Sequence, residues 1–107
     1  MNRGTVCWIN FEPSTPPEFG KIRPAVVISN SEQNRLLPTV VVIPVSSRPP
    51  QLWPLRVGII VKPKVKSFAV IPGIRQVHKL RIKSTLKLLT TEEILNIEEA
   101  LRVYLGE

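Results

Sequence analysis

Few side chains of this sequence have the types needed for nucleophilic, acid–base or metal chemistry. Its 107 residues include one His, His78, one Cys, Cys7, and no Asp. A disulfide within the chain and a Cys/His zinc site therefore lack partners, and a Ser-His-Asp triad is excluded, although a Glu could still orient a His. Chemistry must come from Arg, Lys, Ser, Thr, Glu or the lone His. We expect neither a metal nor another cofactor.

The charge of the chain is strongly positive and unevenly placed. Fifteen Lys and Arg against eight Glu give a net charge of +7. Residues 1–90 hold fourteen of the basic side chains and three Glu, whereas residues 91–107 hold one Arg and five Glu. The basic part is expected to face an anion, and nucleic acid, a phosphate group and an acidic protein are all candidates.

Short β-strands are expected to position these side chains. The chain contains eleven Pro, placed at intervals typical of short strands joined by turns. The predicted strands cover residues 4–11, 23–29, 39–45, 55–61, 67–71 and, as a short one, 74–77. Three Pro in residues 12–21 make that segment an exposed loop, a natural place for binding residues. Ser46 follows a strand, where its hydroxyl can reach solvent.

The last segment changes to a helical period. Thr90 followed by Glu93 is a capping-box pattern, and Gly106 supplies a stop. Apolar side chains recur at spacings of three and four residues, at Ile94, Ile97, Leu101 and Tyr104. The sequence therefore predicts one mainly β domain over residues 1–107, with an amphipathic helix at 91–105 laid on a small barrel. No apolar run is long enough to cross a bilayer, so we expect a cytoplasmic protein without membrane contact.

Four short motifs, in this order and spacing, resemble the MazF/PemK toxin family over nearly the whole chain. They are Gly20-Lys21-Ile22-Arg23-Pro24, Asn34-Arg35, Pro44-Val45-Ser46-Ser47 and the stretch from Ile74 to Lys79. The resemblance implies an SH3-like barrel of the MazF/PemK/CcdB type that forms a homodimer. It also implies a ribosome-independent endoribonuclease of a type II toxin–antitoxin system, which cleaves mRNA.

The resemblance also suggests which side chains carry the activity. Arg23 matches the family's catalytic arginine, and Ser46 matches the position of a catalytic threonine. Positions that line or support the RNA groove match Trp8, Glu18 and Arg75. The full set of candidate RNA-binding residues is Trp8, Glu18, Phe19, Lys21, Ser47, Arg48, Arg75 and His78.

Metal-free RNA cleavage of this kind uses the 2′-hydroxyl to attack the adjacent phosphate, which yields a 2′,3′-cyclic phosphate. A guanidinium is planar and always charged, so Arg23 suits stabilisation of the charged phosphate oxygens, and its pKa makes it a poor base. Ser46 would donate its hydroxyl to a phosphate oxygen. The ring of Trp8 belongs either to the barrel core or to a base-stacking surface, and Phe19 is a candidate for stacking a base or meeting a partner.

The partners expected from the resemblance are single-stranded RNA, a second copy of the chain and a cognate acidic antitoxin that competes for the basic groove. Thr5, Pro72 and His78 stand where the family has acidic residues. A catalytically weakened homologue that binds RNA or only the antitoxin therefore stays open. A third alternative is a CcdB-like gyrase inhibitor, in which the C-terminal residues would act.

Overall fold

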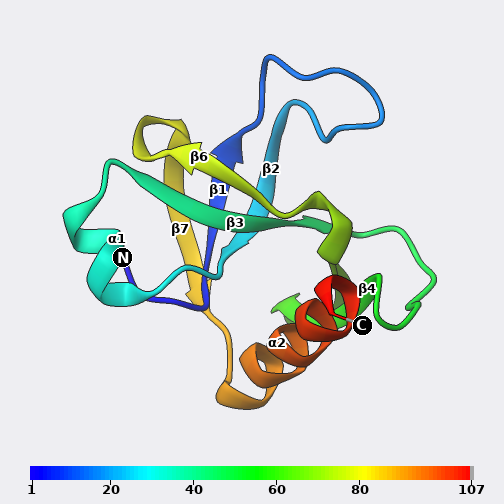
Figure 1. Cartoon of the computed structure of the whole chain (residues 1–107). Coiled ribbons are helices and arrows are strands. Elements are labelled where there is room, and N and C mark those ends of the chain that lie inside the picture. The colour runs from blue at the N-terminus through cyan, green and yellow to red at the C-terminus, as the bar shows by residue number, and fades with distance from the viewer. Residues whose placement is uncertain (107) are drawn as a thin grey trace.

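The computed structural model describes residues 1–106, and Glu107, the last residue of the predicted domain, lies outside them. In chain order the elements are β1 (Thr5–Asn10), β2 (Ile22–Val27), α1 (Ser31–Leu36), β3 (Thr39–Ser46), β4 (Arg56–Lys62), β5 (Val65–Val70), η1 (Ile71–Gly73), β6 (Arg75–His78), η2 (Lys79–Arg81), β7 (Ile82–Leu88) and α2 (Thr91–Leu105). Figure 1 shows α1 and α2 far apart, with the strands between them. None of the described helices is long and apolar enough to span a bilayer.

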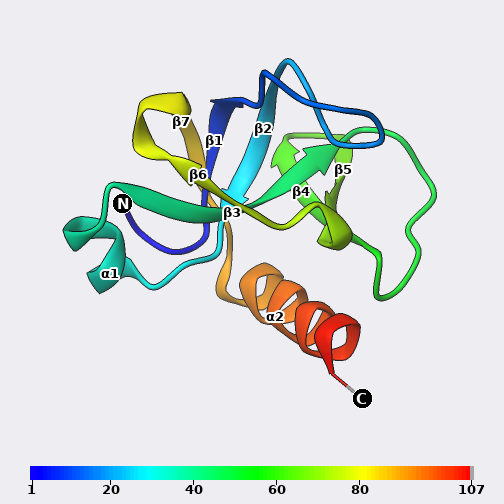
Figure 2. The same ribbon diagram turned by 45° about the horizontal axis from the view of Figure 1, so that its top comes forward.

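The strands form one strongly bent antiparallel sheet in the order β4-β5-β3-β2-β1-β7, and β6 also pairs with β3. β3 joins the two halves of the sheet. Val42 and the residues before it pair with β6, Val42 to Pro44 pair with β2, and Val45 and Ser46 pair with β5. Figure 2 shows β3 crossing from the side of α1 toward β5. The predicted mainly β fold with a C-terminal helix is confirmed.

β7 is the one strand that the sequence did not indicate. It pairs with β1 at the edge of the sheet, and most of its side chains are exposed. Because an edge strand with a solvated face needs no regular apolar pattern, the segment Ile82–Leu88 gave no strand signal. The other strands lie where the β-branched runs predicted them, within a few residues.

Two apolar clusters lie on opposite faces of the sheet. Alternate side chains of β1 enter different clusters: Val6 packs with Val26 and Ile43, whereas Cys7 and Ile9 pack in the other cluster. This alternation shows that both faces of β1 are covered. Cys7 is fully buried, and burial raises the pKa of its thiol to about 11.

Helix α2 covers the first of these clusters. The predicted capping box is present, since Thr90 Oγ1 accepts the Glu93 N–H at 3.1 Å and Glu93 Oε1 accepts the Thr90 N–H at 3.0 Å. Ile97 is fully buried and Ile94 packs against the cluster. The prediction that Tyr104 continues the buried stripe is wrong, because the residue is 41% exposed.

Glu93 has a second structural role at the edge of the barrel. Its Oε2 accepts the Ile60 N–H of β4 at 2.8 Å, and Lys87 Nζ of β7 donates to the Ile60 carbonyl at 2.8 Å. The two edge strands are thus joined through side chains instead of a backbone ladder. Such contacts protect an edge strand from pairing with another chain.

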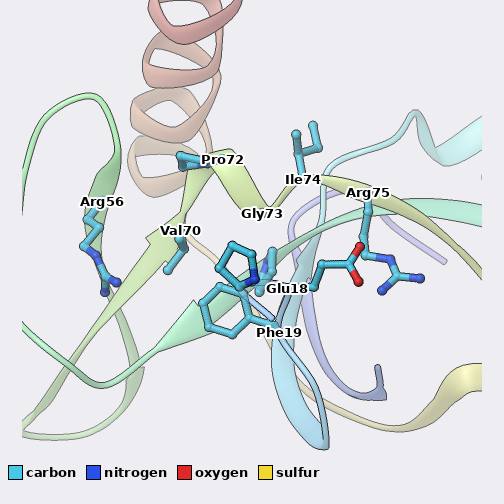
Figure 3. Close-up of a pocket in the computed structure, with 10 residues that line it drawn as sticks. Glu18, Phe19, Arg56, Val70, Pro72, Gly73, Ile74 and Arg75 are labelled. Carbon is cyan, nitrogen blue, oxygen red and sulfur yellow. The ribbon is translucent and has the colours of Figure 1, made fainter. Parts of the chain in front are cut away.

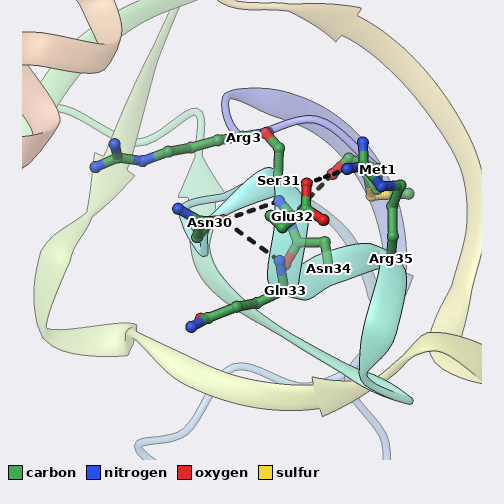
Figure 4. Close-up of polar contacts among 8 residues, drawn as sticks. All are labelled: Met1, Arg3, Asn30, Ser31, Glu32, Gln33, Asn34 and Arg35. Atoms are coloured by element: carbon green, nitrogen blue, oxygen red, sulfur yellow. Dashed lines mark hydrogen bonds and ion pairs between the residues drawn. The ribbon is translucent and has the colours of Figure 1, made fainter.

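The short helix α1 is held to the N-terminal residues by polar contacts (Figure 4). Asn30 caps it by accepting the N–H groups of Glu32 and Gln33. Asn34 is 1% exposed and donates to the carbonyls of Met1 and Ser29, both at 3.0 Å. The Asn of the Asn34-Arg35 motif is therefore a buried structural residue that ties α1 to the N-terminus.

Candidate functional site

A basic cleft of about 460 Å³ opens where β1, β2, β3 and β4 converge. We call it the Arg23 cleft. Six of the ten predicted site residues line it, namely Trp8, Lys21, Arg23, Ser46, Ser47 and Arg48. The structure therefore brings together both predicted catalytic residues, which lie on neighbouring strands of the sheet.

Arg23 is held at the start of β2 by its backbone and by the preceding loop. Its Cα lies opposite Ile9 of β1, and its Nε donates to the Gly20 carbonyl at 2.9 Å. The guanidinium carbon lies 5.0 Å from the centre of the Phe19 ring. Within residues 1–106, the two terminal nitrogens of Arg23 have no hydrogen-bond partner, so both can donate to a ligand in the cleft.

Ser46 is the last residue of β3, where it lies opposite Phe68 of β5. Its Oγ accepts the Arg48 N–H at 3.1 Å, which orders the turn after the strand. The sequence places its hydroxyl where it can reach solvent; in the structure the residue is only 7% exposed and packs below the turn. It still lines the cleft, and since its oxygen accepts from Arg48, its hydrogen can donate to a ligand.

The electrostatics of this cleft are one-sided. Among residues 1–106, four cationic side chains and no carboxylate line it, and these cations are Lys21, Arg23, Arg48 and Lys62. The three ion pairs found among the described residues all lie elsewhere: Arg3–Glu98, Arg35–Glu32 and Arg102–Glu99. A cleft with several unneutralised cations favours a phosphate-bearing ligand.

Sequence reasoning missed two polar residues of the cleft wall, Lys62 and Ser67. Lys62 ends β4 and Ser67 lies in the adjacent strand β5, where it is 8% exposed. The alternation of Lys at 62, 64 and 66 was a signal for phosphate contact, but it did not show which Lys faces the site. For Ser67 the sequence held no signal, because a Ser inside a strand is ordinary.

A second cleft of about 600 Å³ lies beside the first, and we call it the Phe19 cleft. Three other predicted site residues line it, Glu18, Phe19 and Arg75, together with Arg56. Figure 3 shows Phe19 in the middle of the lining, with Arg56 and Arg75 toward opposite ends. Because Phe19 contacts Arg23, the two clefts share this pair as a common wall.

Glu18 and Arg75 are both engaged with the protein itself. The Glu18 carboxylate accepts the Thr15 N–H at 2.8 Å, and its own N–H donates to the Thr15 carbonyl at 2.9 Å, so the residue closes a turn inside the loop. The guanidinium carbon of Arg75 lies 5.7 Å from the centre of the buried Phe11 ring. Glu18 is the one carboxylate in the lining of the two clefts, within the part of the chain that the structure describes.

His78 is the predicted site residue that the structure places apart from the others. It ends β6 opposite Thr39 of β3, and its Nδ1 accepts the Leu80 N–H at 3.0 Å. It lines neither cleft. Trp8 is half-buried and forms part of the cleft wall, so its ring is shared between the barrel and the site. Residues 1–106 contain no group of three or more His, Cys, Asp or Glu that could hold a metal ion.

Comparison with known protein families identifies the family to which the chain belongs. The profile of PemK-like, MazF-like toxins of type II toxin–antitoxin systems matches residues 2–105. The chain belongs to this family. The match covers both clefts and confirms the resemblance predicted from the sequence motifs.

Solved structures show the same MazF-type fold. MazF from Deinococcus radiodurans superposes with a TM-score of 0.86 at 24% identity, over 100% of this chain and 97% of that one. An endoribonuclease in complex with its cognate antitoxin, from a mycobacterial species, gives a TM-score of 0.80 at 20% identity, over 99% of this chain and 95% of that one. The Mycobacterium tuberculosis toxin MazF-mt6 gives 0.77 at 13% identity, over 92% and 93% of the two chains. At these identities the likeness concerns the fold.

Proposed function

We propose that this protein is a metal-independent, sequence-selective endoribonuclease that cleaves single-stranded mRNA. The observation that carries the proposal is the Arg23 cleft, in which Arg23 and Ser46 meet among unneutralised cations. Family membership supports it, as does the similarity to a protein described as an endoribonuclease. Selectivity for RNA over DNA follows from the reaction, because only RNA carries the attacking 2′-hydroxyl.

The proposed reaction is a transesterification within the RNA strand. The 2′-oxygen attacks phosphorus while the bond from phosphorus to O5′ breaks, giving a 2′,3′-cyclic phosphate and a 5′-hydroxyl. One proton leaves the 2′-hydroxyl and one is delivered to O5′, so no water is consumed. Negative charge grows on the nonbridging oxygens, where the terminal nitrogens of Arg23 donate two hydrogen bonds and the Ser46 hydroxyl donates a third.

The same cleft accounts for the proposed partners. A basic groove attracts an acidic peptide as well as RNA, and related folds have been solved with a cognate antitoxin, so we propose a cognate acidic antitoxin as the inhibitor. We further propose a cytoplasmic homodimer. Exposed apolar side chains on α2 support the second copy, notably Leu95 and Leu105, which are 57% and 66% exposed. A monomeric mass by sedimentation at high protein concentration would contradict the dimer.

The deciding experiment is incubation of the purified protein with a long mixed-sequence RNA in EDTA. We expect fragments that end in a 2′,3′-cyclic phosphate, and we expect Arg23→Ala to lose activity while Arg102→Ala, on the far helix, retains it. RNA that stays intact with wild-type protein, or equal cleavage by Arg23→Ala, would refute the proposal. Retained RNA binding without cleavage would indicate the weakened homologue, and gyrase-dependent DNA breakage would indicate the CcdB-like alternative.

A further inference from the structure

We propose that Phe19 is a positioning residue that fixes the orientation of Arg23 by a cation–π contact. The inference deepens the proposed function, on which its kinetic test rests. It differs from the interpretation of Phe19 as a base-stacking ring, since the structure shows what already occupies one face of that ring. The guanidinium carbon of Arg23 lies over it, 5.0 Å from the centroid.

The backbone between the two residues explains why they meet. Lys21 has a φ of +62°, a left-handed conformation that turns the chain back on itself. Residues 19 and 20 therefore lie over the start of β2. At Gly20 an added Cβ would meet Glu12 Oε1 and Ser14 Oγ, the ends of two side chains of the same loop, so the loop packs closely around this residue.

The turn holds Arg23 at two points. The Gly20 carbonyl accepts its Nε–H at 2.9 Å, and the guanidinium carbon lies over the Phe19 ring. Both contacts leave the terminal nitrogens free for a phosphate. A flexible Arg would otherwise have to be ordered when the substrate binds, whereas a guanidinium already fixed on an aromatic face loses less freedom in the reaction.

The Phe19 ring also has neighbours in the Phe19 cleft. Phe19 lines the second cleft together with Pro44 and Gly73, and a Cβ at Gly73 would lie 2.7 Å from Pro44 Cγ and 3.6 Å from Phe19 Cδ2. The residue is half-buried, although the loop around it is largely exposed. Phe19 thus lies beside Gly73 of η1 (Figure 3) and lines the cleft with Pro44 of β3, and it also contacts Arg23.

Substitutions at Phe19 that separate ring electrostatics from bulk test this inference. Phe19→Leu keeps an apolar side chain without a π face, and we expect kcat for RNA cleavage to fall roughly 5-fold or more while KM changes little. Phe19→Tyr keeps the face and should stay near wild type. Replacing Phe19 with mono-, di- and trifluorophenylalanine should lower kcat stepwise, because each fluorine withdraws charge from the ring face at nearly constant shape.

Two kinetic outcomes would overturn the proposal. One is a kcat that does not respond to fluorination. The other is a loss confined to KM and shared by all variants, which would indicate that the ring contacts a base. Leu80→Ala is a control, because Leu80 is 82% exposed and lines neither cleft. Its kcat and KM should equal those of wild type.

A second measurement separates this inference from the proposed nuclease activity. In the free protein, the ring current of Phe19 should shift the NMR signals of the Arg23 side chain. The shift should persist in Phe19→Tyr and disappear in Phe19→Leu. Identical Arg23 signals in wild type and Phe19→Leu would refute the positioning role, whatever the cleavage assay shows. If the protein cleaves no RNA but shows the shift, the nuclease proposal is refuted while the contact between Phe19 and Arg23 is supported.

Discussion

Charged side chains have different roles in two regions of this molecule, helix α2 and the Arg23 cleft. Four of the five charged side chains on α2 are engaged with the protein: Glu98 pairs with Arg3 at 2.6 Å, Glu99 pairs with Arg102, and Glu93 accepts backbone N–H groups. The cations of the Arg23 cleft have no carboxylate partner within residues 1–106. Grouping like charges without partners costs free energy. The difference indicates that α2 uses its charges for folding, whereas the cleft keeps its charges for a ligand.

The strongest test of this comparison is a substitution that keeps the charge of the cleft and removes its geometry. Arg23→Lys retains a cation but loses the planar pair of donors. We expect the cleavage rate to fall roughly 10²-fold, close to the ~10²–10³-fold loss typical of removing an electrostatic donor. Single-turnover kinetics with saturating enzyme measure the effect. A nearly unchanged rate would show that the cleft needs only charge, and Arg35→Lys, in an exposed ion pair of α1, is the matched control.

Removing a neutral donor from the same cleft should cost less. Ser46→Ala deletes a hydroxyl that is placed to bond a charged oxygen, and a hydrogen bond of this type corresponds to roughly 10–100-fold in rate. The same assay applies, with thermal melting to monitor the turn that Ser46 orders through Arg48. Ser84→Ala, on the exposed edge strand β7, should leave both rate and melting temperature unchanged. An unaltered rate in Ser46→Ala would remove Ser46 from the mechanism.

A smaller effect is expected for the charge at the cleft rim. Lys62→Ala should weaken RNA binding by a few fold and lower the slope of log K against log salt by about 0.7, the value for one phosphate contact to a single strand. Fluorescence anisotropy with a noncleavable RNA across a salt series measures that slope. Lys83→Ala removes an exposed Lys that lines neither cleft, and its slope should match wild type. Equal slopes for both variants would argue that RNA does not reach Lys62.

The parts of this structure that follow local rules were predictable from the sequence. The capping box at Thr90 and the apolar spacing through Ile97 predict α2, and the β-branched runs predict β2 and β3. By contrast, the contact of Phe19 with Arg23 depends on a left-handed backbone at Lys21, and Lys does not signal that conformation. Lys62 joins the site only because β4 pairs with β5, which in turn pairs with β3, a nonlocal arrangement that spacing along the chain does not encode.

The smallest expected effect tests the α2 side of the comparison. Glu93→Gln should leave RNA cleavage unchanged and lower the free energy of unfolding by about 1 kcal/mol, because the carboxylate both completes the capping box and accepts the Ile60 N–H. Denaturant unfolding measures the difference. Glu92→Gln is the matched control, since Glu92 is exposed in the same helical turn and lacks these contacts.

The difference in unfolding free energy between wild type and Glu93→Gln should depend on pH. Partial burial raises the pKa of the Glu93 carboxyl, but hydrogen bonds from Ile60 and Thr90 and the charge of Lys87 outweigh it, so the pKa lies below the usual 4.5. A depressed folded-state pKa contributes stability that is fully present above 4.5 and is lost as pH falls through the lowered value. The gap between wild type and Glu93→Gln should therefore be constant near neutrality and shrink in acid. A difference in unfolding free energy that persists or widens in acid would show that the negative charge of Glu93 is not what holds the edge of β4 to α2.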